Sequence, residues 1–124
     1  MSALRDDAVY LGHIRDAISQ IESYLKGVGE AEFLGTPLIQ DGVIRQIQII
    51  GEAAKRVSMD FRERTPSIPW ADITGMRDKI VHDYMGVDLE TVWETATRDV
   101  AALMSDLQKL AEDTAESKRR SQQR

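Results

Sequence analysis

The chain has 124 residues and no cysteine, so we expect one domain that buries its own core in a reducing compartment, with no disulfide and no thiolate metal site. The formal net charge of −5 argues against a generic polyanion binder, although positive charge gathers locally around residues 55–56, 62–64 and 77–79. The charged N-terminus lacks the apolar core of a signal peptide and no segment is long enough to span a bilayer, so we expect a cytoplasmic protein with no membrane partner.

The first predicted element is an amphipathic helix. Apolar side chains recur every three or four residues from Leu4 to Val28, which describes one stripe of a helix. His13 lies beside this stripe and is interpreted as a boundary residue, because no second histidine or cysteine stands at metal-ligand spacing. The segment Gly27-Val28-Gly29 should end the helix, and Ala31 to Leu34 could form one turn before Pro37.

Two further helices are predicted in the middle of the chain. The second runs from about Leu38 to Val57, and its wide apolar arc predicts a central, well-buried helix. The stretch from Arg62 to Pro69 holds two prolines and is predicted to be a loop. Pro69 suits the first turn of a third helix, which passes Val81 and ends before Gly86.

A fourth, long helix is predicted after Asp88, whose carboxylate can cap the first turn. Its stripe from Leu89 to Leu110 covers about six turns, and no segment shows a strand pattern. We therefore predict an all-α fold, an antiparallel up-and-down bundle of four to five helices formed by residues 1–115 as a single domain. Residues 116–124 are polar and basic, and we predict a disordered tail. Such an architecture does not indicate a function.

The most informative stretch runs from Arg77 to Tyr84, which places a fixed cation, carboxylates, an imidazole and a phenol within about two helical turns. On a regular helix Asp78 and His82 would share one face and could hydrogen-bond. Arg77 and His82 would diverge by about 140°, unless the helix ends near His82 or a two-fold partner supplies a second copy of the motif. From spacing alone, a solvated surface helix with an Asp-to-His pair is the more ordinary explanation.

The residue types nevertheless suit the cleavage of RNA. A guanidinium can stabilise phosphate charge, and an imidazole can move protons near neutral pH. A neighbouring carboxylate can fix which nitrogen of the imidazole carries the proton. Together these groups are a plausible set for cutting RNA.

Several motifs follow one another in the order typical of a known family. They are Gly51-Glu52-Ala53-Ala54-Lys55-Arg56, Ile68-Pro69-Trp70, Gly75-Met76-Arg77-Asp78, Val81-His82-Asp83-Tyr84, Gly86-Val87-Asp88 and Val92-Trp93. Together they resemble the HepT family of HEPN-domain toxins over most of residues 43–100. The family motif is an arginine followed directly by a polar residue, a histidine separated from the arginine by four positions, and a tyrosine two positions after the histidine. It is matched at Arg77, Asp78, His82 and Tyr84, with aspartate where related domains often have asparagine.

The resemblance implies a metal-independent endoribonuclease without cofactor that acts as the toxin of a two-gene module. Such toxins are homodimers whose two motifs meet in a cleft, and the antitoxin is a minimal nucleotidyltransferase that attaches AMP to the motif tyrosine, here Tyr84. His82 would be the general acid or base, Arg77 would stabilise the phosphate, and Asp78 would orient one of the two. Further candidates for contacts with RNA in the cleft are Glu52, Lys55 and Lys79.

A second hypothesis of a different class stays open. The same bundle could be a non-catalytic accessory subunit that helps a nucleotidyltransferase bind its substrate, with the motif shaping an interface or a nucleotide pocket. The acidic net charge favours this hypothesis modestly, whereas the complete four-residue motif favours the nuclease.

Overall fold

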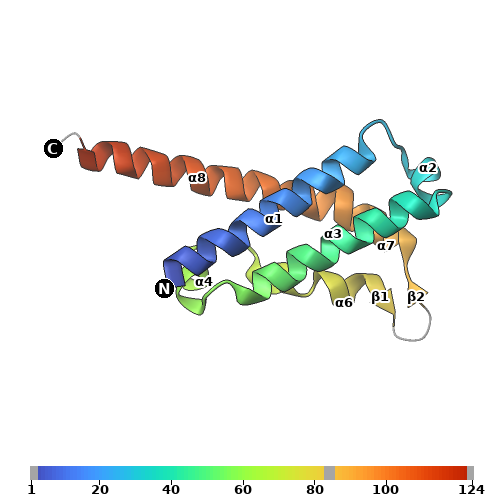
Figure 1. Cartoon of the computed structure of the whole chain (residues 1–124), viewed down its shortest axis with the longest axis horizontal. Coiled ribbons are helices and arrows are strands. Elements are labelled where there is room, and N and C mark those ends of the chain that lie inside the picture. The colour runs from blue at the N-terminus through green and yellow to red at the C-terminus, as the bar shows by residue number, and fades with distance from the viewer. Residues whose placement is uncertain (1–2, 83–85, 123–124) are drawn as a thin grey trace.

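The computed structural model describes the backbone of residues 3–82 and 86–122, and the side chains of residues 6–80, 86–113 and 119–122. Within these ranges the chain is mostly helical, as predicted, and contains one hairpin of two very short strands (Figure 1). The expectation that no strand forms was therefore wrong at this one place. The two strands are β1 (Val81–His82) and β2 (Gly86–Val87), and they pair antiparallel.

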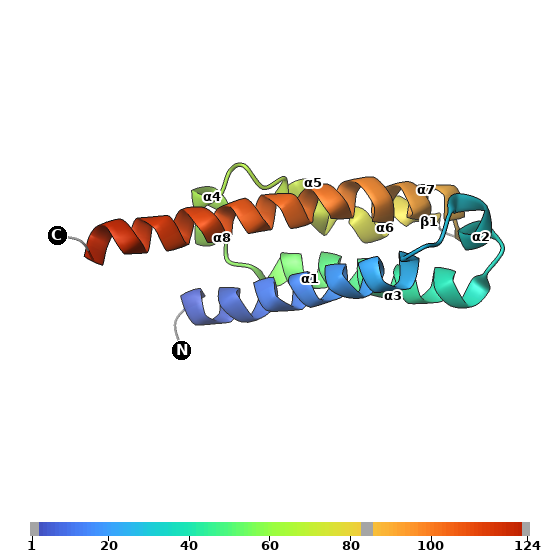
Figure 2. The same ribbon diagram turned by 90° about the horizontal axis from the view of Figure 1, so that it is seen from above.

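The helices form two layers, which Figure 2 shows from above. The first layer holds α1 (Ala3–Leu25) and α3 (Pro37–Arg56), which run antiparallel and are joined through α2 (Glu30–Leu34). The second layer holds α4 (Met59–Arg64), α5 (Trp70–Thr74), α6 (Met76–Ile80), α7 (Leu89–Glu94) and α8 (Val100–Gln122). A π-helical segment, η2 (Thr95–Asp99), connects α7 to α8 without a break.

Local signals in the sequence explain most of these boundaries. Helix α1 ends just before Gly27, whose φ of 73° lies in the left-handed region that glycine tolerates. Pro37 stands in the first turn of α3, where its missing N–H leaves no intrahelical bond unmade. Asp88 caps α7 as predicted, since its Oδ1 accepts the backbone N–H of Thr91 at 3.2 Å.

Three boundaries differ from the prediction. We expected a loop from Arg62 onward, but the helix α4 continues through Arg64. Ser58 caps this helix by accepting the backbone N–H of Phe61 at 3.1 Å. The expected third helix is two short helices, α5 and α6, that meet at Gly75. Finally, the backbone of α8 stays helical through Gln122, where we predicted disorder from residue 116, and it extends past the start of α1 (Figure 1).

The hydrophobic core lies between the two layers and draws on nearly every helix. Its fully buried side chains include Ile14, Ile18 and Ile21 of α1, Val43, Ile47 and Ile50 of α3, Ile73 of α5, Ile80 of α6, Val92 of α7, and Val100 and Leu107 of α8. Phe33 of α2 packs its ring 5.4 Å from that of Trp93 and closes one end of the core. The last residue of α6, Ile80, is therefore anchored in the core, directly before β1.

A buried carboxylate joins the beginning of α1 to the beginning of α4. Asp7 is 3% exposed, and its Oδ1 accepts the backbone N–H of Ser58 while its Oδ2 accepts the hydroxyl of Ser58, both at 2.7 Å. The same hydroxyl oxygen caps α4. Asp7 thus orients a capping residue that lies 51 positions away in the chain.

We expect Asp7→Ala to lower the free energy of unfolding by about 1.5–3 kcal/mol, because it removes two charge-assisted hydrogen bonds and leaves a backbone amide without its partner. Asp16→Ala is the matched control, since Asp16 is an exposed residue inside the same helix. It should change stability by less than about 0.5 kcal/mol. Urea unfolding followed by circular dichroism measures both variants, and equal losses would contradict the role given to Asp7.

Candidate active site

Arg77 stands on α6 where this helix crosses α3. At the crossing, α3 carries a buried glycine, Gly51. A Cβ at Gly51 would lie 3.9 Å from the Cβ of Arg77, 3.7 Å from the carbonyl oxygen of Ile73 and 3.8 Å from that of Thr74. The missing side chain therefore lets the two helices approach closely. The Arg77 side chain itself is 48% exposed, so its base is held by packing while its guanidinium reaches solvent.

The two residues that follow Arg77 have different partners. The Oδ1 of Asp78 lies 3.7 Å from Nη1 of Arg77, and because both side chains are largely exposed this contact adds little stability. The Nζ of Lys79 lies 3.1 Å from Oδ2 of Asp99 in η2. Positions 77 and 79 are rotated by about 200° on a helix, which agrees with Arg77 facing α3 and Lys79 facing the C-terminal helix. The structure thus brings Asp78, but not Lys79, to Arg77.

His82 does not belong to the helix that carries Arg77. Helix α6 ends at Ile80, and His82 lies in β1, where its partner across the hairpin is Gly86. The expectation that Asp78 and His82 share a helical face was therefore wrong. On a continuous helix Arg77 and His82 would diverge, and we gave two ways for them to converge: an early helix end or a second copy of the motif in a dimer. Because the helix does end early, the helical geometry no longer argues for a dimer. The side chain of His82 lies outside the described residues.

The hairpin is fixed at its base. The backbone N–H of Asp88 donates to the carbonyl oxygen of Ile80 at 3.2 Å, and Gly86 adopts a φ of 85°, which side chains other than glycine rarely allow. Tyr84, the expected site of AMP attachment, falls between the two strands in sequence and lies outside the described residues. Of the predicted motif, α6 carries Arg77 and Asp78, and β1 carries His82.

Glu52 and Lys55 lie on α3 one and four positions after Gly51, rotated from it in the same direction by about 100° and 40°. Both are exposed, and the surface pair that their spacing suggests does not form among the described side chains. Lys55 follows Gly51 by one turn, so it shares the face of α3 that α6 approaches. Glu52 is rotated toward α1 and lines a hollow there. Of the two candidates, Lys55 is the one directed to the side of Arg77.

Two residues that matter for the placement of Arg77 were not predicted from the sequence. Gly51 was quoted only as part of a motif, although a glycine inside a predicted helix is a signal for a close helix crossing. Asp99 was not singled out in the sequence, because no short-range pattern links it to Lys79 twenty positions earlier. Gly51 lets α6 approach α3, whereas Asp99 orients the side chain of Lys79.

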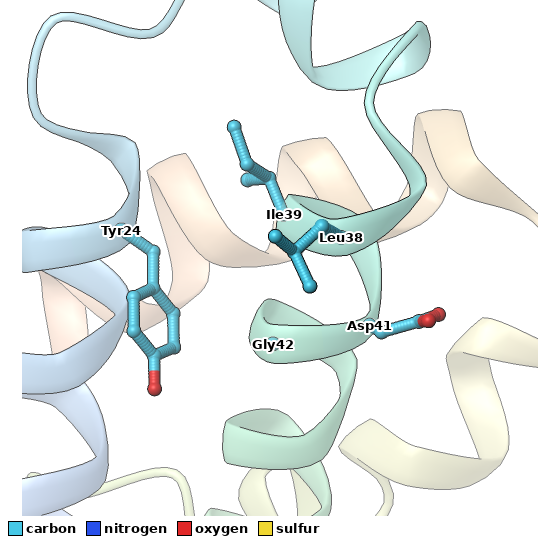
Figure 3. Close-up of a pocket in the computed structure, with 5 residues that line it drawn as sticks. All are labelled: Tyr24, Leu38, Ile39, Asp41 and Gly42. Carbon is cyan, nitrogen blue, oxygen red and sulfur yellow. The ribbon is translucent and has the colours of Figure 1, made fainter.

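A separate apolar hollow of about 510 Å³ lies near the start of α3 (Figure 3). The ring of Tyr24 covers Gly42, where a Cβ would come within 3.2 Å of it, and Asp41 points away from that ring. Leu38 is 83% exposed at the rim. Gly42 precedes Gly51 by nine residues, about 13 Å along α3, so this hollow is distinct from the region of Arg77.

In the part of the chain with assigned positions, no cluster of three or more histidine or acidic side chains is arranged to hold a metal ion. Across the same part, no helix has the length and apolar character needed to cross a membrane.

Comparison with known proteins gives a consistent result. Residues 14–110 match the family described as ribonuclease HepT-like. An RNase candidate of Methanocaldococcus jannaschii is 38% identical over 112 residues, which cover 90% of this chain and 97% of that protein. A HepT ribonuclease candidate of Thermococcus cleftensis is 40% identical over 101 residues, which cover 82% of this chain and 92% of that protein.

A third relative is larger than this chain. It is a gamma-glutamylcyclotransferase and RNase candidate of Methanocaldococcus jannaschii, 40% identical over 114 residues that cover 92% of this chain but 51% of that protein, so the chain spans about half of its length. No solved structure matches the chain significantly. The matches place this helical protein among the ribonucleases. It belongs to the ribonuclease HepT-like family.

Proposed function

We propose that the chain is a metal-independent endoribonuclease whose reacting groups are Arg77, His82 and Asp78. The observation that carries the proposal is the close crossing at Gly51, which holds the base of Arg77 and leaves its guanidinium half exposed, within the segment that matches the family. The end of α6 at Ile80 supports the proposal further, because it frees His82 from the helical geometry that would turn it away from Arg77.

The proposed reaction uses the RNA's own ribose. The 2′-hydroxyl attacks the adjacent phosphorus, His82 accepts its proton as general base, and the bond from phosphorus to the 5′-oxygen breaks. The leaving 5′-oxygen takes up a proton, so the products end in a 2′,3′-cyclic phosphate and a 5′-hydroxyl. Arg77 donates to two oxygens of the phosphate as its charge grows. The contact between Asp78 and Arg77 favours a role for Asp78 in holding the guanidinium.

This reaction is tested by incubating purified protein with RNA in the presence of a chelator. We expect cleavage at the same rate with and without the chelator, and fragments that carry cyclic phosphate ends. A requirement for added divalent metal would contradict the proposal. Expression of the chain alone in cells separates it from the accessory-subunit hypothesis, because arrest that depends on Arg77 and His82 requires a nuclease.

We also propose that the enzyme acts as a homodimeric toxin, with the two motifs facing each other across a cleft. A cognate minimal nucleotidyltransferase silences it by joining the phenol oxygen of Tyr84 to the α-phosphorus of ATP, with pyrophosphate leaving. Tyr84 lies two positions after His82 in sequence. An attached AMP brings a phosphodiester anion and a purine next to the general base, so charge repulsion and steric block act together against RNA.

Tyr84→Phe should abolish this modification, because it removes the only atom of that side chain that can accept the AMP. Tyr24→Phe is the matched control, since Tyr24 is 37% exposed on α1 and should leave modification at the parent level. Intact mass spectrometry after incubation with the partner and ATP measures both. An AMP adduct on the Tyr84→Phe protein would reject the site.

A further inference from the structure

A small hollow lined by both polar and apolar side chains lies between α1 and α3, on the side of α3 that faces away from α6. Its volume is about 230 Å³. Its lining residues are Tyr10 and His13 of α1 and Ile49, Glu52, Ala53 and Arg56 of α3. Of these residues Ala53 is buried and Ile49 is half-buried, whereas His13, Glu52 and Arg56 are exposed. None of these six residues has been given a role in the proposed reaction except Glu52, as a candidate contact to RNA.

The two charged residues of the hollow are not paired with each other. Glu52 and Arg56 are four positions apart with the acid first, the arrangement that most favours an ion pair on a helix. No such pair forms in the described structure, although Arg64 with Asp60 and Lys79 with Asp99 do pair. A carboxylate that can accept hydrogen bonds and a guanidinium that can donate them therefore line the same space.

The α1 side of the hollow is aromatic. The rings of Tyr10 and His13 lie edge to face, with centroids 6.1 Å apart and an interplanar angle of 75°. Aromatic rings beside an arginine are the usual platform on which unpaired RNA bases stack. The volume is below the roughly 300–1,000 Å³ typical of pockets for drug-sized ligands, and it suits a single base.

The hollow and Arg77 lie on two sides of the same segment of α3. Glu52 directly follows Gly51, whose Cβ position contacts Arg77, and Lys55 stands on the exposed face between them with no ion pair among the described residues. The width of a helix is about 10–12 Å with its side chains, a distance that a few nucleotides of single strand can cross. A strand cut at Arg77 can therefore pass Lys55 and reach the hollow.

We propose that this hollow binds one unpaired base of the RNA substrate, and that guanine is the preferred base. The inference rests on the proposed function, because it takes RNA as the substrate. Guanine presents two adjacent N–H donors on its Watson–Crick edge, and the Glu52 carboxylate can accept both. Uracil has one N–H flanked by two carbonyl oxygens, which the carboxylate repels. Arg56 contacts the phosphate of the same nucleotide, and Tyr10 stacks on the base.

The test measures binding without cleavage. Full-length His82→Ala protein is titrated with labelled single-stranded RNA of equal length, either all uracil or with one central guanine, and fluorescence anisotropy gives the dissociation constants at fixed salt. We expect the guanine-containing RNA to bind about tenfold more tightly. In the same background, Glu52→Gln should remove most of this preference, and Tyr10→Ala should weaken binding of the guanine RNA about tenfold. The matched controls Glu63→Gln on α4 and Tyr24→Ala, both away from the hollow, should bind like the parent.

Different failures have different meanings. The base pocket would be overturned if both RNAs bound equally well. It would also be overturned if the Glu52→Gln and Tyr10→Ala proteins bound RNA like the controls. In either case, cleavage of RNA by the parent protein in chelator would leave the nuclease proposal intact. A change of oligomeric mass in the Tyr10→Ala protein, measured by light scattering, would also overturn it, because the hollow would then be an interface between copies. A parent protein that binds the guanine RNA through Glu52 and Tyr10 but never cuts it would overturn the nuclease proposal and leave the pocket intact.

Discussion

A His82→Ala variant is expected to cleave RNA about 10²–10⁴ times more slowly than the parent, because it loses the imidazole that we propose as general base for the 2′-hydroxyl. Arg77→Ala should slow cleavage by a similar factor, because it removes the cation that we propose stabilises the phosphate. Among the described residues, no other cation pairs with the Asp78 carboxylate and could replace it. Arg77→Lys should fall between, because it keeps the charge and loses the two-pronged donor geometry. Initial cleavage rates of a defined RNA in chelator measure all three variants.

The control for these substitutions is Arg64→Ala. Arg64 is an exposed arginine on α4, and its Nη2 lies 2.9 Å from Oδ2 of Asp60. Its removal therefore deletes the same kind of charge from a helix that carries no residue of the motif. It should cut RNA at the parent rate, and circular dichroism should show that every variant keeps its helices. Parent-like cleavage by purified His82→Ala protein would show that the general base is another group.

Gly51→Leu is expected to lower cleavage about 10²-fold while the remaining fold persists. The Cβ position at Gly51 already has three atoms within 3.7–3.9 Å, so the rest of a leucine side chain has to push α6 and the base of Arg77 away from α3. Overpacking of this kind costs about 1–3 kcal/mol of stability, and a displacement of about 1 Å in a reacting group can lower a rate 10²-fold. Cleavage rates and urea unfolding are measured on the same preparations.

Two controls isolate the crossing. Gly51→Ala places a single methyl group at ordinary contact distance, so it should keep the parent rate and gain helix stability of up to about 1 kcal/mol. Gly12→Leu adds the same large side chain to a glycine inside α1 whose Cβ position has nothing within 4 Å, so it should leave cleavage unchanged. If Gly12→Leu lowered cleavage as much as Gly51→Leu, the crossing would have no special role.

Much of the fold followed from local patterns in the sequence. The three-four spacing of apolar residues predicted the long helices, and the signals at Gly27, Pro37 and Asp88 fixed their ends to within a few residues. These features could be predicted because each depends on residues close in sequence. The small helix α4 was missed although its cap is local, since Ser58 accepts the backbone N–H of Phe61. No local pattern could show that Asp7, 51 positions away, binds this capping residue.

The motif shows the same division. The residues of the motif could be found in the sequence from their types and order. The neighbouring element that each side chain of α6 faces could not be predicted. Arg77 faces α3 because Gly51 admits it, and Lys79 faces η2 because Asp99 binds it. The split between α6 and β1 was missed because the periodicity continues through Ile80 and Val81, whereas the hairpin bond between Asp88 and Ile80 joins residues eight apart.

Helix α6 has only five residues, far fewer than an isolated helix needs to persist in water. It exists because Met76 and Ile80 are buried in the core and because α3 leaves room for its backbone at Gly51. Arg77, the proposed phosphate-binding residue, therefore has no local scaffold that could survive loss of the core. A peptide cut from this region would keep every residue of the motif and lose the site, and activity and global unfolding should share one cooperative transition.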